Sequence, residues 1–461
     1  MSVQAERISK LNTAPERPER RYVLYWAQMN RRVEANHGLL YAAELANRHQ
    51  LPVLYYEGLT CSYEYANDRL HTFLLEGVPD TARRLKTAGI GYVFYLRRTR
   101  TAPNHALYDL AKHAAAVVTD LYPTFIARDH NRRVPEKVDV AYYAVDSSCI
   151  VPMSQIPERQ YGAYTIRPRI KRLLPRFLKE PDALRVKRRF DGPIPAFHTE
   201  VAAKDIPELV ASCEINHSIA PSPDFRGGSA RAAQLLELFL EKNLSRYALG
   251  RNQPSEHATS HMSPYLHFGQ ISALQIALAV QSYAQQHKLI ADEYLEELIV
   301  RRELAFNYAA HVETPESLDN LPEWCRQNMQ KHARDKRDPS YTPQQLERAE
   351  TYDELWNATQ KEMLIRGKIH GYYRMYWGKK IIEWSPTYQQ AVRTMIDIHG
   401  WYALDGRDPN TYTNILWCFG LHDRPWPERP IFGKMRYMSL DGMKRKTDTA
   451  AYIEEIRHLH G

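Results

Sequence analysis

The sequence predicts a two-part fold, an α/β domain with a largely parallel, Rossmann-like sheet followed by an all-helical domain. Two observations predict it. Short β-rich runs alternate with helical stretches over residues 21–150, whereas the apolar spacing beyond residue 231 is helical throughout. The chain has 461 residues, enough for two or three domains that each bury a core.

In the first domain, β-branched and aromatic runs predict strands, and amphipathic stretches between them predict helices. The strands are expected at 22–26, 52–56, 92–96, 117–119 and 138–145, and the helices at 37–48, 80–87 and 104–115. Helices between successive strands imply crossover connections and therefore parallel pairing with both faces covered. The domain lacks both GxGxxG and GxxxxGK[ST], so an ordinary dinucleotide or triphosphate site is not indicated.

Three further segments complete the predicted organisation. Residues 1–20 are polar, without the apolar core of a secretory signal, and are expected to form a flexible arm. Residues 151–230 are rich in Pro, Arg and Lys and are expected to be an extended connector with short helices. Residues 231–461 form the helical domain, with helices expected at 232–249, 271–286, 292–311, 370–384 and 389–398.

Composition excludes several classes of protein. Hydrophobic residues make up 44% and charged residues 25%, which is ordinary for a globular chain. There is no apolar run of about eighteen residues, so no membrane span is expected. The five cysteines are scattered without a CxxC pair, which favours reduced thiols over a zinc site or disulfide frame. HExxH and GxSxG are missing, and no metal site is expected.

The charge balance favours a polyanionic partner. Lys and Arg number 62 against 54 acidic residues, a net charge of +8. Near the C-terminus, basic and aromatic residues interleave, which suits phosphates and a stacked base. A solvated charge run is the competing interpretation. The residues concerned are Trp426, Lys434, Arg436, Lys444, Arg445 and Lys446.

Tryptophans concentrate in the predicted helical domain, which holds all of them except Trp26. Trp377 and Trp384 are seven residues apart, two turns along one helix face. Core packing explains such a pair simply. The functional interpretation is an electron relay, because indole rings can be oxidised and can pass a hole to the surface.

Several motifs together resemble a known family. The run TSHMSPYLHFGQ at 259–270 looks like the flavin phosphate-binding signature of photolyases and cryptochromes. The segments LWNA at 355–358, HGYYRMYWGKKIIEW at 370–384, LDGRDPN at 404–410 and FGKMRYMSLDGMKRK at 432–446 are similar to class II cyclobutane pyrimidine dimer photolyases in particular. Their order and spacing match over nearly the whole chain.

The resemblance implies a light-driven DNA repair enzyme with FAD in the helical domain. Reduced, anionic FAD, once excited, would give an electron to a pyrimidine dimer, whose ring splits before the electron returns. It further implies UV-damaged DNA as partner, no membrane, a monomer by family default, and a cytoplasmic or nuclear location. The antenna chromophore of the first domain stays open: a deazaflavin, a folate, a flavin or none.

The resemblance also implies which residues bind FAD. Arg374 and Asp405 would form an ion pair beside the flavin ring, where a guanidinium stabilises negative charge. Either His399 or Asn410 would face flavin N5. The phosphates and the ribityl chain would lie among Tyr247, Thr259, Ser260, His261, Met262 and Ser263, with an added charge from Arg302.

The remaining implied roles concern DNA and electron transfer. Glu297 would contact the flipped dimer, with Met375 and Trp426 as apolar walls of the lesion pocket. Arg251 and Asn252 would lie near the opened duplex. The implied relay runs from Trp377 through Trp356 to Trp384, from flavin to surface.

Some positions depart from the family pattern. Arg301 stands where some members have a tryptophan, and Phe306 where an acid is commoner. The segment 420–423 is one residue shorter than in some relatives. A titratable His399 beside N5 would alter flavin tuning. The alternatives are a cryptochrome-like photoreceptor without repair, a (6-4) photolyase and a DNA-binding protein without enzymatic activity; the class II motifs and the set Glu297, Met375 and Trp426 favour dimer repair.

Overall fold

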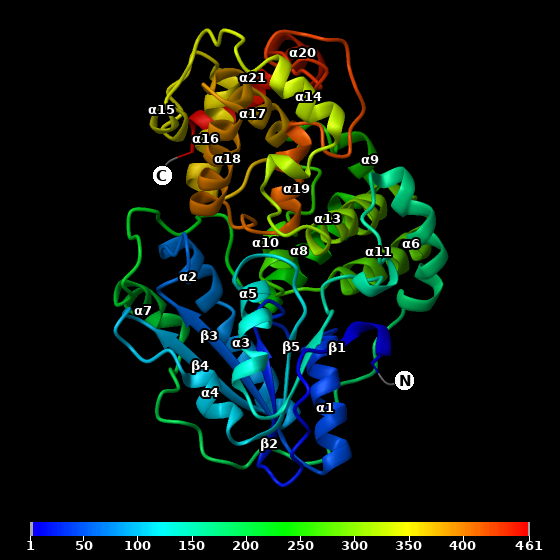
Figure 1. Cartoon of the computed structure of the whole chain (residues 1–461), viewed down its shortest axis with the longest axis vertical. Helices are drawn as coiled ribbons and strands as arrows, with labels where there is room; N and C mark the ends of the chain where they lie inside the picture. Colours follow the sequence, from blue (N-terminus) through cyan, green and yellow to red (C-terminus); the bar gives the residue numbers. More distant parts are fainter. Residues whose placement is uncertain (1–2, 460–461) are drawn as a thin grey trace.

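A computed structural model of the chain describes residues 3–459. The first part contains a six-stranded sheet in the order β1-β6-β5-β2-β3-β4 (Figure 1). All neighbouring strands pair in parallel except β1, which runs antiparallel to β6, so the expected parallel sheet is confirmed. The strands are β1 (Ile8–Lys10), β2 (Tyr22–Ala27), β3 (Val53–Thr60), β4 (Gly91–Arg97), β5 (Ala114–Asp120) and β6 (Ala141–Val145).

Helices cover both faces of this sheet. On β2, Val23 and Tyr25 pack into one core with α1, whereas Leu24 and Trp26 pack into another with α4. This alternation is what a strand buried on both sides requires. The helices of this part are α1 (His37–His49), α2 (Asp68–Leu75), α3 (Val78–Ala88), α4 (Ala106–Ala111) and α5 (Phe125–Arg133).

The expectation of a flexible arm at 1–20 is wrong for the described residues. Ile8 pairs with Val145 at the sheet edge. The buried guanidinium of Arg7 donates to the carbonyl oxygens of Asp146, Cys149 and Ile150. A three-residue edge strand is too short to show a periodic pattern in the sequence. Hydrogen bonds to distant segments hold it in place, and the local sequence does not reveal them.

The connector is less extended than expected. It contains α6 (Ala163–Phe177), a fifteen-residue helix with two internal prolines, and the short α7 (Ile206–Ala211). In Figure 1, α6 lies among the helices of the second part, and Arg167 on it pairs with Glu296 at 2.7 Å. The helix therefore packs as part of the helical domain, although the chain before and after it is irregular.

The second part is helical, as expected. A π-helical stretch, η7 (Glu296–Arg301), interrupts the long predicted helix at 292–311. Its α-helices are α8 (Ser229–Lys242), α9 (Tyr247–Gly250), α10 (Ser263–His267), α11 (Ala273–His287), α12 (Asp292–Leu295), α13 (Arg302–Ala310), α14 (Glu323–Lys331), α15 (Pro343–Glu347), α16 (Glu354–Arg366), α17 (Gly371–Trp384), α18 (Tyr388–Tyr402), α19 (Pro409–Cys418), α20 (Leu440–Lys446) and α21 (Thr449–Arg457). Short 3₁₀ turns occur at Ala5–Arg7, Pro135–Lys137, Met153–Gln155, Ala203–Asp205, Leu244–Arg246, Pro254–Glu256 and Leu318–Asn320.

The two parts are joined by buried polar contacts. Arg69 on α2 donates to the carbonyl oxygens of Met363, Leu364 and Ile365 at the end of α16, and to that of Tyr402 at the end of α18. Carbonyls at a helix C-terminus are short of intrahelical partners, although that of Met363 also accepts from the backbone N–H of Gly367, and a cation suits the negative end of a helix. No helix within residues 3–459 is long and apolar enough to cross a membrane.

Candidate active site

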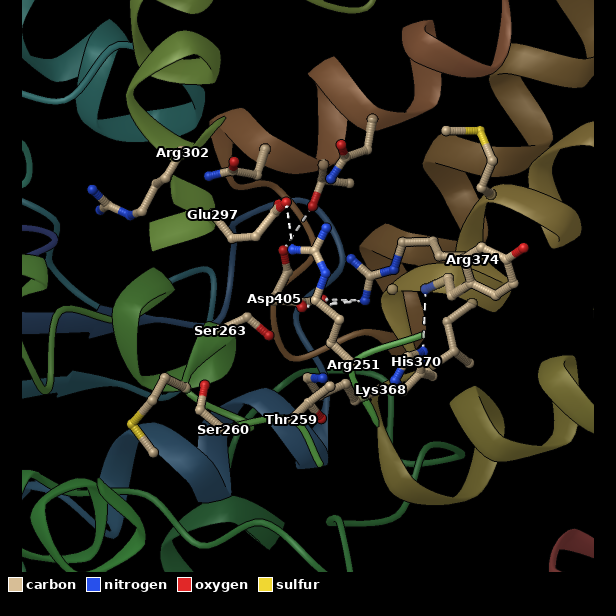
Figure 2. A pocket seen from close by; sticks show the side chains of 18 of the residues that line it. Arg251, Thr259, Ser260, Ser263, Glu297, Arg302, Lys368, His370, Arg374 and Asp405 are labelled. Atoms are coloured by element: carbon tan, nitrogen blue, oxygen red, sulfur yellow. Dashed lines mark hydrogen bonds and ion pairs between the residues drawn. The ribbon is translucent and has the colours of Figure 1, made fainter. Parts of the chain in front are cut away.

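A cavity of about 480 Å³ opens in the helical part, within the size range of cofactor sites. Figure 2 shows its walls converging from the segment before α10, from η7, from the start of α17 and from the region of Asp405. Most residues expected to bind the cofactor, the lesion or the opened duplex line it. These are Tyr247, Arg251, Asn252, Thr259, Ser260, Met262, Ser263, Glu297, Arg302, Arg374, Met375, Asp405, Asn410 and Arg436.

Arg374 and Asp405 form the expected ion pair. Nη2 of Arg374 lies 3.0 and 3.2 Å from the two carboxylate oxygens of Asp405. Burial alone would raise the pKa of Asp405. The charges of Arg374 and Lys368, with a hydrogen bond from Ser263, outweigh burial and hold that pKa well below its usual value. The pair therefore stays ionised, and Nε of Arg374 has no partner within the described chain.

The hydroxyl-rich segment before α10 lies on the same cavity (Figure 2). Ser260 accepts a hydrogen bond from the hydroxyl of Tyr294 at 3.1 Å, which fixes its orientation. His261 does not line the cavity, and its backbone adopts a left-handed conformation with φ +56°. Burial lowers the pKa of His261 to about 3, so its ring is neutral.

The two candidates for flavin N5 differ in position. Asn410 lines the cavity, and its amide nitrogen donates to Asp408 at 2.8 Å, which leaves its carbonyl oxygen free to accept. His399 is buried beside the ring of Trp377, 4.9 Å between centroids, and is not part of the wall. Its Nδ1 must carry hydrogen, since it contacts the carbonyl oxygen of Met395 at 2.8 Å. Nε2 is then an acceptor without a partner in residues 3–459.

The residues expected to contact the lesion include one acidic side chain and two apolar ones. Glu297, on η7, forms an ion pair with Arg251 at 2.9 Å while 42% of its side chain stays exposed. Met375 lines the wall with its sulfur 3.7 Å from that of Cys418. Trp426 is not on the wall. Its ring lies under the guanidinium of Arg436, and Arg436 does line the cavity. Trp426 is therefore separated from the cavity by the side chain of Arg436.

The three relay tryptophans form a buried stack. Trp356 lies parallel to Trp377 at 6.4 Å and edge-on to Trp384 at 5.5 Å. This is the expected spatial order, but Trp384 is not at the surface, being 1% exposed. Tyr352, 59% exposed, lies next to it at 5.7 Å, so an aromatic path reaches solvent one ring later.

The basic residues expected to meet DNA gather near the cavity. Lys444, Arg445 and Lys446 are exposed on the last turn of α20, and Lys434 is exposed on the preceding loop. The side chain of Gln253 donates to the carbonyl oxygen of Lys446 at 2.8 Å, which brings Arg251 and Asn252 next to this turn. Lys444, Arg445 and Lys446 thus lie next to Arg251 and Asn252, which line the cavity.

Sequence reasoning missed several wall residues. Asn414 and Trp417 follow Asn410 by four and seven positions, one face of α19, and all three line the cavity. That spacing could have found them. Lys368 and His370, just before α17, also line the wall. They carry no helical pattern, so only the fold reveals them.

The positions that depart from the family pattern have distinct surroundings. Arg301 lies over the ring of Trp417 at 5.7 Å and pairs with Glu296. Phe306 is fully buried, edge-on to Tyr122 and beneath the guanidinium of Arg302, so it is a core residue. Arg301 is therefore the one that borders the cavity wall, through Trp417.

Comparisons with known proteins agree with this arrangement. The family model described as DNA photolyase matches residues 23–187. A deoxyribodipyrimidine photo-lyase of Methanothermobacter thermautotrophicus is 39% identical over 99% of both chains. The chain belongs to the DNA photolyase family. The expectations of a lyase, of a flavoprotein and of light-dependent DNA repair are thereby confirmed at the level of the family.

Further relatives share this full-length likeness. The Arabidopsis thaliana deoxyribodipyrimidine photo-lyase is 35% identical over 100% of this chain and 94% of its own. Among solved structures, a Synechocystis cryptochrome matches with a TM-score of 0.73 and 15% identity, covering 95% of this chain and 89% of that one. A Sulfolobus tokodaii photolyase with two FAD molecules matches with a TM-score of 0.68 and 16% identity, covering 94% and 89%. These structures establish the photolyase and cryptochrome fold for this chain.

Proposed function

We propose that this photolyase is a class II enzyme that splits cyclobutane pyrimidine dimers, with FAD held in the cavity of the helical part. The observation that carries the proposal is that the Arg374–Asp405 ion pair and the Glu297 carboxylate line one cavity, and that Trp377 of the tryptophan stack follows Arg374 by three residues on α17. The curated relatives are named for action on deoxyribodipyrimidine, which supports the substrate.

The residues present fit FAD. The cavity offers hydroxyls on the segment before α10, and buried nitrogens of Arg374 and His370 that lack partners in the described residues, as a polar ligand requires. When bound in its reduced, anionic form, FAD supplies on illumination the electron that opens the cyclobutane ring. Arg374, oriented by Asp405, stabilises negative charge next to the ring, and either Asn410 or His399 accepts a hydrogen bond at N5.

The dimer is bound by the remaining wall. Glu297 accepts a hydrogen bond from the pyrimidine edge of the flipped lesion, against Met375 as an apolar wall. Arg251 and Asn252 hold the opened duplex, and the basic residues at 434–446 contact its phosphates. A damaged pair costs less to extrude from the stack than an intact one, which contributes to selectivity.

A repair assay decides between this function and a photoreceptor. The purified chain, with its flavin reduced, is illuminated with an oligonucleotide carrying one cyclobutane thymine dimer, and repair is followed by the return of absorbance at 260 nm. We expect light-dependent loss of the dimer, with a dark sample and a (6-4) oligonucleotide as controls. A flavin that photoreduces normally while the dimer survives would favour the cryptochrome-like alternative.

A further inference from the structure

His370 leaves a hydrogen-bond donor unused at the cavity. Its Nδ1 accepts from the backbone N–H of Tyr372 at 3.2 Å and so caps the N-terminus of α17. Burial and the nearby charge of Lys368 lower the pKa of His370 to about 3, so the ring is neutral and its hydrogen sits on Nε2. That N–H is buried without a partner in residues 3–459, on a side chain that is 9% exposed. A buried donor without a partner is unfavourable, so a ligand acceptor is expected there.

Lys368 brings to the same place a positive charge that no carboxylate contacts directly among the described residues. It lines the cavity and forms no ion pair within 4.0 Å among the described residues. Its carboxylate neighbour Asp405 is already held by Arg374, and the charge of Arg374 repels Lys368. Burial, with that repulsion, lowers the pKa of Lys368.

The side chains that line the whole cavity carry more positive than negative charge. Five cationic side chains line it against three acidic ones, an excess of two positive charges. Two of the acids are taken up by Arg374 and Arg251. The third, Asp408, receives hydrogen bonds from Tyr122 and Asn410. Lys368, Arg302 and Arg436 are left without an ion-pair partner among the described residues, so the cavity suits an anion from outside the chain.

We propose that Lys368 and His370 bind the diphosphate of FAD, Lys368 through its ammonium group and His370 through its neutral Nε2–H. This assignment rests on the proposed function, and it extends the FAD site beyond the hydroxyl segment before α10. A diphosphate carries two negative charges, which match the excess of the cavity, and lysine is a common phosphate ligand. Figure 2 shows Lys368 and His370 at the end of the cavity where Thr259 is drawn, and both act electrostatically on neighbouring His261.

A phosphate of the DNA backbone is the other source of the same chemistry. The position of the pair favours FAD. Lys368 interacts electrostatically with Asp405 and with Glu362 on α16, whereas the exposed basic residues lie on α20.

The test uses the full-length holoprotein and two variants. Lys368→Met removes the charge and keeps the length of the side chain, while His370→Ser keeps a capping oxygen for α17 and removes the Nε2 donor. The matched control is Lys361→Met, on the exposed face of α16. For each, the dissociation constant of FAD is measured by flavin fluorescence, and the ³¹P resonances of bound FAD are recorded.

We expect Lys368→Met to weaken FAD binding on the order of 10- to 100-fold and to shift a ³¹P resonance of the bound diphosphate. His370→Ser should shift a ³¹P resonance with a smaller loss of affinity. The flavin absorption bands of the remaining holoprotein should be unchanged, and Lys361→Met should match the parent protein in every readout. Circular dichroism of each variant identifies any that fails to fold.

Three results would overturn the assignment, and each points elsewhere. If folded Lys368→Met binds FAD with the parent affinity and unshifted ³¹P resonances, Lys368 does not contact the diphosphate, although the proposed function stands. If it keeps FAD but loses affinity for dimer-containing DNA, the phosphate is that of DNA. If the parent protein itself binds no FAD, the proposed function fails and this inference fails with it.

Discussion

At the scale of single residues, the two ion pairs that line the cavity differ in how firmly they are held. Asp405 holds Arg374 by two contacts of 3.0 and 3.2 Å, so this guanidinium keeps one orientation. Glu297 is instead half exposed and shares its charge with Arg251 across the opening. The first pair suits a bound cofactor, and the second suits a substrate that comes and goes.

Replacing Glu297 by Ala should lower the quantum yield of dimer repair by about 10-fold or more while FAD occupancy is unchanged, because a hydrogen bond to a charged group is removed. Glu297→Gln, which keeps a hydrogen-bonding oxygen, should retain an intermediate yield. The measurement is dimer loss per absorbed photon at saturating DNA. A quantum yield equal to that of the parent in the Ala variant would remove Glu297 from the reaction.

The N5 neighbour is identifiable by redox measurement. Burial and the charge of Arg374 lower the pKa of His399 to about 3, so its imidazole is as uncharged at neutral pH as the amide of Asn410. Substituting the true neighbour, as His399→Ala or Asn410→Ala, should shift the flavin midpoint potential measured by spectroelectrochemistry. The other variant serves as the control. If both variants keep the midpoint potential of the parent protein, neither residue contacts N5.

At the scale of elements, local irregularity supplies the site. The π-helical turns of η7 lie between α12 and α13 and place Glu297 on the cavity. Such wide helical turns are common at functional sites, and no residue pattern in the sequence predicts them. The face of α19 that carries Asn410, Asn414 and Trp417 follows ordinary helical spacing and was predictable.

Elements with a local periodic pattern are predictable from the sequence, and elements that depend on distant contacts are not. The parallel sheet and the later helices follow from apolar period alone. The helix expected at 104–115 ends at Ala111 because Ala114–Ala116 begin the buried strand β5, where small residues fit between covered faces. β1 and the wall residues Lys368 and His370 depend on contacts between distant segments, which a local pattern does not contain.

The tryptophan stack is an element whose function a single substitution tests. Trp377→Phe should block photoreduction of oxidised flavin, because phenylalanine is far harder to oxidise than tryptophan, and should spare repair by chemically reduced enzyme. Trp401→Phe is the control, since Trp401 packs edge-on to Tyr65 outside the stack. The readout is the rate of flavin bleaching under blue light with a reductant. Unimpaired bleaching in Trp377→Phe would mean that electrons take another route.

At the scale of the whole molecule, part of the positive charge lies on the exposed residues Lys444, Arg445 and Lys446 at the end of α20. Replacing Lys444, Arg445 and Lys446 together by Gln should weaken binding of dimer-containing duplex and reduce the slope of log affinity against log salt by about 1 for each phosphate that is no longer neutralised. Titrations at several salt concentrations give that slope. A triple variant of exposed lysines in the first domain, K86Q/K112Q/K137Q, removes the same charge and should keep the parent slope. If both triple variants behave alike, only net charge matters.

Arg69 has a consequence for how this protein could be divided. Its guanidinium, carried by the first domain, binds carbonyls at the ends of α16 and α18, and α16 bears Trp356 of the stack. A fragment consisting of the helical part alone would lose these hydrogen bonds at the ends of α16 and α18. We therefore expect gene fusions or truncations that separate the two parts to yield a protein that loses the flavin proposed to bind in the helical part.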